Sequence, residues 1–198
     1  MNTQSQPARK PDHAIAPQFL NRWSPRAFSD HSLTEADMNL LFEAARWAPS
    51  ASNNQPWRFA YGLRGDDGFA KIATGLVPFN RAWAEKSAAL VVVASRSTVT
   101  RAEEGEVPNP FHSFDAGTAW GFLALQAHLS GLIAHAMGGF DGQALAASLN
   151  LPEGYVIHAV VAIGHQGKVE TLPEALQARE TPSGRLPISQ TVGRGGFV

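Results

Sequence analysis

The spacing of apolar side chains along the sequence changes between two periods, which predicts a protein of mixed helices and strands. Apolar residues recur every three or four positions over about 35–47 and again over 69–76, as in helices with one buried face. Residues 57–61 instead alternate apolar and polar side chains, the pattern of a half-buried strand. The run Leu-Val-Val-Val-Ala at 90–94 is continuously apolar and largely β-branched, so it predicts a central strand covered on both faces.

The second half of the chain continues this mixture. Residues 114–131 predict a long core helix with one apolar stripe, made up of Phe114, Thr118, Phe122, Leu125 and Leu129. Its glycines would allow another helix to approach closely, and we expect a second subunit there. Residues 96–111 are charged and contain prolines, so they predict a mobile surface loop of the kind that often determines substrate choice. Further helices are expected over 81–88, 141–149 and 173–180, and further strands over 132–137 and 155–163.

Chain length and the polar N-terminal stretch set the expected domain organisation. At 198 residues the chain is long enough for one substantial core and short for two. Residues 1–16 are polar and contain prolines, which predicts a flexible N-terminal arm, and residues 17–198 are expected to form a single domain. Ser32 and Glu35 have the spacing of a capping box at the start of the helix over about 35–47.

The composition excludes several classes of function. Hydrophobic residues make up 44% of the chain and charged residues 17%, which is typical of a globular protein. The formal net charge of -1 argues against a nucleic acid or an anionic membrane as partner, and no apolar run approaches the ~20 residues that span a bilayer. We therefore expect a soluble, cytoplasmic protein. The absence of cysteine excludes disulfides and thiolate chemistry, and the seven histidines show no metal-binding pattern, so the electrons of any redox reaction would pass through a bound cofactor.

Residues 47–57, Trp-Ala-Pro-Ser-Ala-Ser-Asn-Asn-Gln-Pro-Trp, are interpreted as an active loop. Two prolines bracket the polar part, so the preceding helix should stop near Trp47 and the segment should lack regular structure. Its hydroxyl and amide side chains offer donors and acceptors without charge, which suits a flat, polar heterocycle. The alternative is a turn built of ordinary turn formers, and composition does not decide between the two.

Residues 21–28, Asn-Arg-Trp-Ser-Pro-Arg-Ala-Phe, contain a second candidate site. Arg22, Ser24 and Arg26 lie within five residues of one another. Two guanidinium groups and a hydroxyl can hold a phosphate through several charge-assisted hydrogen bonds. The alternative is a pair of arginines on a solvated surface.

Together the two segments resemble the paired signature of the flavin-dependent nitroreductase family, Arg-x-Ser-x-Arg-x-Phe followed by Ala-Pro-Ser-x-x-Asn-x-Gln-Pro-Trp. The similarity extends through residues 79–80, 115–131 and 137–141 to Arg185. It implies an α+β fold with a central, mostly antiparallel sheet flanked by helices, in an intertwined homodimer. It also implies FMN at each of the two subunit interfaces, with NADH or NADPH as transient electron donor.

The resemblance further implies which residues bind FMN. Arg22, Ser24, Arg26 and Arg185 would hold the phosphate, and the segment 49–55 would contact the pyrimidine edge and the ribityl chain. Asn80 would meet the flavin ring, and a main-chain N–H at 138–139 would point at its reactive nitrogen. A helix cap is the alternative role for Asn80, and a plain strand-to-helix turn is the alternative for 138–139. The implied cofactor-binding residues are Arg22, Trp23, Ser24, Arg26, Pro49, Ser50, Asn53, Gln55, Asn80, Gly138, Gly139 and Arg185, with no catalytic side chain and no metal.

The function implied by the resemblance is that of an FMN-dependent oxidoreductase with a ping-pong mechanism. NAD(P)H would give a hydride to FMN and leave before a small-molecule acceptor binds, such as a nitroaromatic, a quinone or an activated alkene. One alternative is a flavin-binding sensor or carrier without turnover. An interaction module that binds no flavin is a third possibility.

Four residues of this chain depart from the family's pattern. Ala82 and Trp83 stand where many members carry a lysine after the asparagine, and Ser183 stands where another basic residue is common. Ala51 replaces a serine that is often found in the active loop. Fewer cations around the flavin would stabilise its anionic reduced ring less and lower its reduction potential. Trp83 would then be free to line the pocket.

Overall fold

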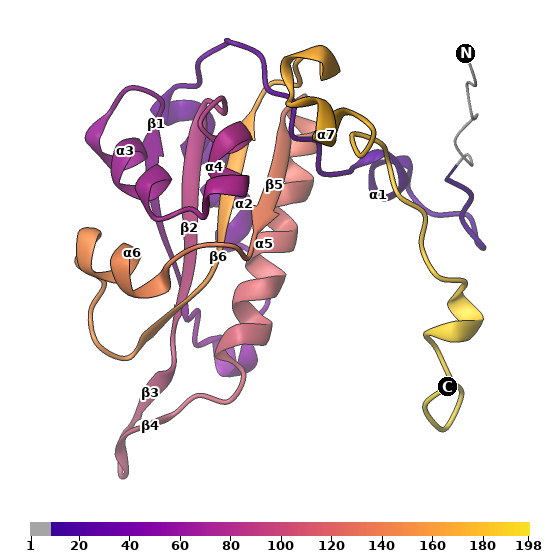
Figure 1. Cartoon of the computed structure of the whole chain (residues 1–198). Coiled ribbons are helices and arrows are strands. Elements are labelled where there is room, and N and C mark those ends of the chain that lie inside the picture. The colour runs from indigo at the N-terminus through magenta and orange to yellow at the C-terminus, as the bar shows by residue number, and fades with distance from the viewer. Residues whose placement is uncertain (1–8) are drawn as a thin grey trace.

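The computed structural model describes residues 9–198 and consists of a four-stranded sheet between two layers of helices (Figure 1). The α-helices are α1 (Pro17–Asn21), α2 (Glu35–Arg46), α3 (Asp67–Thr74), α4 (Pro78–Ala84), α5 (His112–Leu129), α6 (Gly142–Ser148) and α7 (Glu174–Gln177). The strands are β1 (Trp57–Leu63), β2 (Ala89–Arg96), β3 (Thr98–Arg101), β4 (Gly105–Pro108), β5 (Ile133–Met137) and β6 (Tyr155–Gly164). Short 3-10 turns are η1 (Ala51–Asn53), η2 (Val169–Thr171) and η3 (Ile188–Gln190).

The main sheet is antiparallel throughout, with the strand order β1-β2-β6-β5. All residues of β2 before Arg96 are buried, which confirms the predicted central strand. The strands predicted at 57–61, 132–137 and 155–163 are observed as β1, β5 and β6. The predicted α+β class with a central antiparallel sheet is thus confirmed.

The two faces of the sheet pack against different helices. Val91 and Val93 belong to a core cluster with α2 and α5. Leu90 and Val92 belong to a second cluster, with α3, α4 and α6 on the opposite face. Alternate residues of β2 therefore pack in two different cores, and a shift of register by one residue would exchange both sets of contacts.

The predicted helix over 35–47 is observed as α2, but its capping box involves a different pair of residues. The Thr34 hydroxyl accepts a hydrogen bond from the Asp37 main-chain N–H (3.2 Å), and the Asp37 carboxylate accepts one from the Thr34 N–H (2.8 Å). The predicted pair of Ser32 and Glu35 is wrong because the helix starts two residues later than that pair requires. Trp47 ends the helix, as expected.

Helix α5 corresponds to the predicted long helix, but its buried face is not the predicted apolar stripe. The residues that pack in the core are Asp115, Ala116, Ala119, Leu123, Ala124 and Ala127. Phe114 is 76% exposed, Leu129 60% and Phe122 41%. Because alanines let α5 lie close to the sheet and to α2, the larger side chains of the stripe remain on the outer surface of the protomer.

Three other segments differ from prediction. Residues 96–111 contain the hairpin of β3 and β4 rather than an irregular loop. The helix predicted over 81–88 begins earlier, at Pro78, because proline is favoured in the first turn of a helix. The helix expected over 173–180 is reduced to the four residues of α7.

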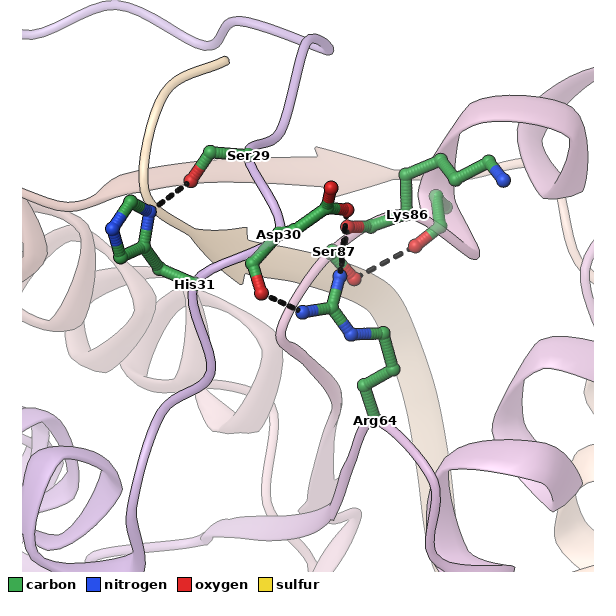
Figure 2. Close-up of polar contacts among 7 residues, drawn as sticks. Ser29, Asp30, His31, Arg64, Lys86 and Ser87 are labelled. Atoms are coloured by element: carbon green, nitrogen blue, oxygen red, sulfur yellow. Dashed lines mark hydrogen bonds and ion pairs between the residues drawn. The ribbon is translucent and has the colours of Figure 1, made fainter.

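Arg64, directly after β1, fixes the segment that leads toward α2 (Figure 2). Its Nη2 donates to the carbonyl oxygen of Asp30 (2.5 Å), and its Nη1 donates to that of Lys86 (3.1 Å). The main-chain N–H of Ser29 donates to the carbonyl oxygen of His165 (3.0 Å) just past β6. These contacts attach residues 29–30 to one end of the sheet, and the preceding residues 22–26 consequently pass beside β5.

The two ends of the described chain project from the same side of the sheet (Figure 1). The Asp12 carboxylate accepts a hydrogen bond from the main-chain N–H of Ile188 (2.7 Å). The tail carries exposed apolar side chains, including Leu186, Val192 and Phe197. Residues 1–8 of the predicted flexible arm lie outside the described residues. No helix within residues 9–198 has the length and apolar character needed to cross a membrane.

Candidate functional site

A pocket of about 300 Å³ lies between residues 22–26, strand β5 and the loop 179–185. We call it the arginine pocket. Five of the residues implied by the resemblance line it, namely Arg22, Trp23, Ser24, Arg26 and Arg185. The other lining residues are Arg9, His135, Arg179, Thr181 and Ser183. The fold therefore gathers five arginine side chains from three separate parts of the chain.

Arg9 connects the N-terminal segment to both walls of the arginine pocket. Its Nη1 donates to the carbonyl oxygens of Leu20 (2.6 Å) and Arg22 (2.8 Å). Its Nε donates to the carbonyl oxygen of Ser183 (2.9 Å). No sequence pattern pointed to Arg9, since it is a single arginine in a stretch expected to be flexible.

Glu180 joins the 179–185 loop to residues 26–27 on the opposite wall of the pocket. Its Oε1 accepts hydrogen bonds from the main-chain N–H groups of Arg26 (2.6 Å) and Ala27 (2.8 Å). Its Oε2 lies 3.8 Å from Nη1 of Arg26, and the side chain is fully buried. Within residues 9–198, no other carboxylate forms an ion pair with an arginine of the pocket. Most of the positive charge there is therefore uncompensated.

Burial and mutual repulsion act together on these arginines. Burial lowers the pKa of Arg22, and the nearby Arg185 and Arg9 lower it further. Burial also lowers the pKa of Arg26, while Glu180 raises it and Arg179 lowers it again. Arginine nevertheless stays charged at neutral pH, because its ordinary pKa lies far above neutral. An anion in the pocket would favour the charged side chains and relieve their repulsion.

His135 lines the arginine pocket from the side of β5. Its Nδ1 lies 3.0 Å from the carbonyl oxygen of Pro25 and must donate the proton, because a carbonyl oxygen only accepts. Burial lowers the pKa of His135; the hydrogen bond to Pro25 opposes this effect, and Arg26 adds to it. The ring is therefore mainly neutral at neutral pH, with Nε2 as its unprotonated nitrogen.

Trp83 does not line the arginine pocket. Its side chain is 1% exposed, stacks on Phe28 with a centroid distance of 6.4 Å and lies 4.7 Å from the His135 ring. The expectation that Trp83 would line the pocket is wrong because α4 turns this side chain into the core. Arg9 and Arg179 supply cations that the family's motifs do not include.

Asn80 and Gly139 meet at the end of β5. The Asn80 side-chain Nδ2 donates to the Gly139 carbonyl oxygen (3.1 Å). A Cβ on Gly139 would lie 2.6 Å from that same nitrogen, so only glycine fits this approach. Asn80 is the third residue of α4 and Val77 is its N-cap, so the capping role is wrong. Gly138 is exposed with open space beside it, which leaves its main chain accessible.

The segment 49–55 forms a strained turn. Its one short element is the three-residue 3-10 turn η1, in which Ser52 has non-helical backbone angles, so the segment is irregular as expected. Ser52, Asn53 and Gln55 all have positive φ angles (51°, 54° and 47°), which is unfavourable for residues with a side chain. Strain of this kind persists where surrounding contacts hold it, often at functional sites.

Hydrogen bonds within the 49–55 segment and to α5 hold this turn. The Ser50 hydroxyl accepts from the Gln55 main-chain N–H (3.0 Å), and the Gln55 side chain donates to the Asn53 carbonyl oxygen (3.1 Å). The carboxylate of Asp115, buried at the start of α5, accepts from the Ala51 main-chain N–H (3.2 Å). The side chains of Asn53 and Gln55 remain at the surface.

The arginine pocket and the 49–55 segment belong to opposite corners of the sheet. Trp57, which follows the segment, pairs with Ser95 and through it with Val156 of β6. His135 of the pocket pairs with Ala162 of β6. The two positions are thus separated by about 20 Å along the strands and about 14 Å across them. Within one protomer the predicted site residues therefore do not form a single group, because the 49–55 segment lies far from the arginine pocket and the Asn80–Gly139 pair lines neither.

Across residues 9–198, no three His, Asp or Glu side chains gather at a spacing that could hold a metal ion. Ser95 lies between His112 (2.7 Å) and His158 (2.6 Å), but this trio is a half-buried hydrogen-bond network at the start of α5.

Comparison with known proteins identifies the family. The Nitroreductase family profile matches residues 20–165. A crystal structure described as an oxidoreductase containing FMN superimposes with a TM-score of 0.93 and 39% identity, covering 96% of each chain. An uncharacterised 15.4 kDa protein of Mycolicibacterium smegmatis is 36% identical over 149 residues, covering 70% of this chain and 95% of that protein. A Thermus thermophilus protein named NADH dehydrogenase is 28% identical over 201 residues, covering 87% of this chain and 92% of its own length. The chain belongs to the nitroreductase family.

Proposed function

We propose that this protein is an FMN-dependent oxidoreductase that transfers reducing equivalents from NADH or NADPH to a small-molecule acceptor. The observation that carries the proposal is the arginine pocket. Five arginine side chains line it, and within the described chain only Arg26 of these forms an ion pair, with the buried Glu180. Such an excess of positive charge suits a phosphate group. The similar crystal structure that contains FMN supports the choice of this cofactor.

The chemistry of the arginine pocket fits the phosphate end of FMN. Arg22, Arg26 and Arg185 would bind the phosphate oxygens, and Ser24 would add a hydroxyl. Trp23 lines the same pocket. Arg9 and Arg179 would contribute further charge. Asn80 would hold the chain after β5 so that an N–H group of Gly138 or Gly139 faces the flavin ring.

The protein's contribution to the reaction is to bind and orient. When bound, FMN supplies the redox chemistry, because it can accept a hydride from NAD(P)H and pass two electrons to an acceptor. The Gly138–Gly139 main chain would stabilise charge on the ring through a hydrogen bond. No side chain is needed as a general base, since water can provide the protons. The nicotinamide donor and the acceptor would bind in turn over the same exposed face of the flavin. This alternation gives a ping-pong mechanism, with nitroaromatics, quinones or activated alkenes as acceptors.

We infer that the complete site requires a homodimer. The arginine pocket and the 49–55 segment lie at opposite corners of one sheet, so one flavin would reach both groups only if a second copy supplies one of them. An apolar groove of about 580 Å³ along α5 is lined by Phe19, Ala44, Gly121, Phe122, Leu125 and Leu129 among others. A second copy would cover this groove and the exposed apolar side chains of the tail.

The first prediction concerns turnover. The purified protein should carry about one FMN per chain, and NADH or NADPH should bleach its visible absorption under anaerobic conditions until an acceptor restores the colour. Bound FMN that neither nicotinamide reduces would favour a sensor or carrier. A protein that binds no FMN would overturn the proposal.

The second prediction concerns the phosphate. Arg185 is exposed and bonds mainly to its own loop, so Arg185→Ala should leave the fold intact. Loss of one charge-assisted contact should weaken FMN binding roughly ten- to hundredfold, or about 1.5–3 kcal/mol. Titration of the apoprotein with FMN measures the effect. Arg101→Ala, on the distant β3–β4 hairpin, is the control, and equal affinities for both variants would remove Arg185 from the site.

The third prediction concerns the active loop. If Gln55 binds the flavin ring, Gln55→Ala should shift the reduction potential of the bound flavin while most of the affinity remains, since a neutral hydrogen bond contributes only ~0.5–1.5 kcal/mol. Ser52→Ala is the matched control because Ser52 shares the positive φ but is not assigned to the flavin. Potentiometry and thermal melting of both variants separate the roles. An unshifted potential with a lowered melting temperature would mean that Gln55 only shapes the turn.

The fourth prediction concerns the dimer. Phe122→Asp places a charge in the apolar groove at a side chain that is 41% exposed, so an isolated protomer should tolerate it. We expect the variant to be monomeric by analytical ultracentrifugation and to retain less FMN. Leu40→Asp, at a comparably exposed position on α2 outside the groove lining, should remain dimeric. A wild-type monomer that holds FMN tightly would contradict the shared site.

A further inference from the structure

His135 combines three features that no other histidine of the described chain shares. It lines the arginine pocket, its Nδ1 is committed to the Pro25 carbonyl oxygen at 3.0 Å, and its ring rests on the buried Trp83. These contacts fix the orientation of the ring. They also make Nε2 the nitrogen that can meet a ligand in the pocket.

A neutral His135 does not suit a phosphate neighbour. With the proton on Nδ1, Nε2 presents a lone pair, and a phosphate oxygen also presents lone pairs. Contact between the two atoms becomes favourable when a proton lies between them. A protonated imidazole would then donate a charge-assisted hydrogen bond to the phosphate.

While the pocket holds no anion, the surrounding charges disfavour protonation of His135. Once an anion is bound, they favour it. The charged groups that act on His135 directly are Arg26 and Glu180. The other charged side chains that line the same pocket are Arg22 from the 22–28 segment, Arg179 and Arg185 from the C-terminal loop, and Arg9 from the N-terminal segment. From α4 His135 meets the uncharged Trp83, and its partner on β6 is Ala162. Burial lowers the pKa of His135, and the charge of Arg26 lowers it further. Main-chain hydrogen bonds to Pro25 and Ser24 and the charge of Glu180 act in the opposite direction. A phosphate would reverse the sign of the local field.

We propose that His135 is a further ligand of the FMN phosphate and that it takes up a proton when the phosphate enters the arginine pocket. This inference rests on the proposed function, because it requires that FMN binds there. The proton moves from solvent to Nε2, and no bond of FMN is broken. FMN affinity should consequently increase as the pH falls toward the range in which the ring becomes charged, by up to about tenfold per pH unit.

The test is calorimetric titration of the apoprotein with FMN in buffers of different ionisation enthalpy, between pH 6.5 and 8. The difference between wild type and His135→Gln should approach about one proton taken up per site. Comparing the two proteins removes the contribution of the phosphate's own titration. Riboflavin, which lacks the phosphate, should show no such difference. His128→Gln, a histidine on α5 outside the pocket lining, should behave as wild type.

Each outcome separates this inference from the proposed function. FMN binding with equal proton uptake in wild type and His135→Gln would overturn the role of His135 while the oxidoreductase proposal stands. Failure of the wild-type protein to bind FMN would overturn the oxidoreductase proposal itself. If His135→Gln does not fold, histidine NMR of the wild-type protein gives the same answer, because the His135 ring signals should change to those of the charged form when FMN is added at pH 7. Signals of a neutral ring in the FMN complex would refute the inference.

Discussion

Repulsion among the like charges of the arginine pocket is the physical constraint on which the candidate site depends. Five arginine side chains line one small pocket, and the fold opposes them with a single carboxylate. That carboxylate, on Glu180, is fully buried and is also bound by two main-chain N–H groups, so it serves the fold as much as the charge balance. Binding of an anion in the pocket would therefore lower the electrostatic free energy of this part of the structure.

The mixture of helices and strands and one cluster of the candidate site could be predicted from local patterns in the sequence, whereas the antiparallel sheet was expected only from the family resemblance. The β-branched run at 90–94 had to be covered on both faces, and β2 is the buried central strand. Arg22, Ser24 and Arg26 are close in sequence, so their gathering needed no knowledge of the fold. Arg185 could be added because a family motif marks it.

The remaining features depend on long-range packing, which no local pattern contains. His135 lines the arginine pocket because β5 is the edge strand of the sheet. Arg9 is held there because its guanidinium group donates hydrogen bonds to backbone carbonyl oxygens of two distant segments. The buried face of α5 was predicted wrongly because large apolar side chains were expected inside, whereas alanines form the close contact. The capping box of α2 was misplaced because two overlapping residue pairs fit the same spacing rule.

The position of Arg9 shows that the folding unit and the binding unit of this chain have different boundaries. The sheet and its two cores are built from residues 27–176. The family profile ends at residue 165, yet Arg9, Arg179 and Arg185 all lie outside the span that it matches. A fragment trimmed to the residues that the profile matches would therefore keep the four strands of the sheet. It would lose three of the five cations, together with two buried leucines of the second core cluster. Where a domain begins and ends is in this case a poor guide to which residues must be kept for ligand binding.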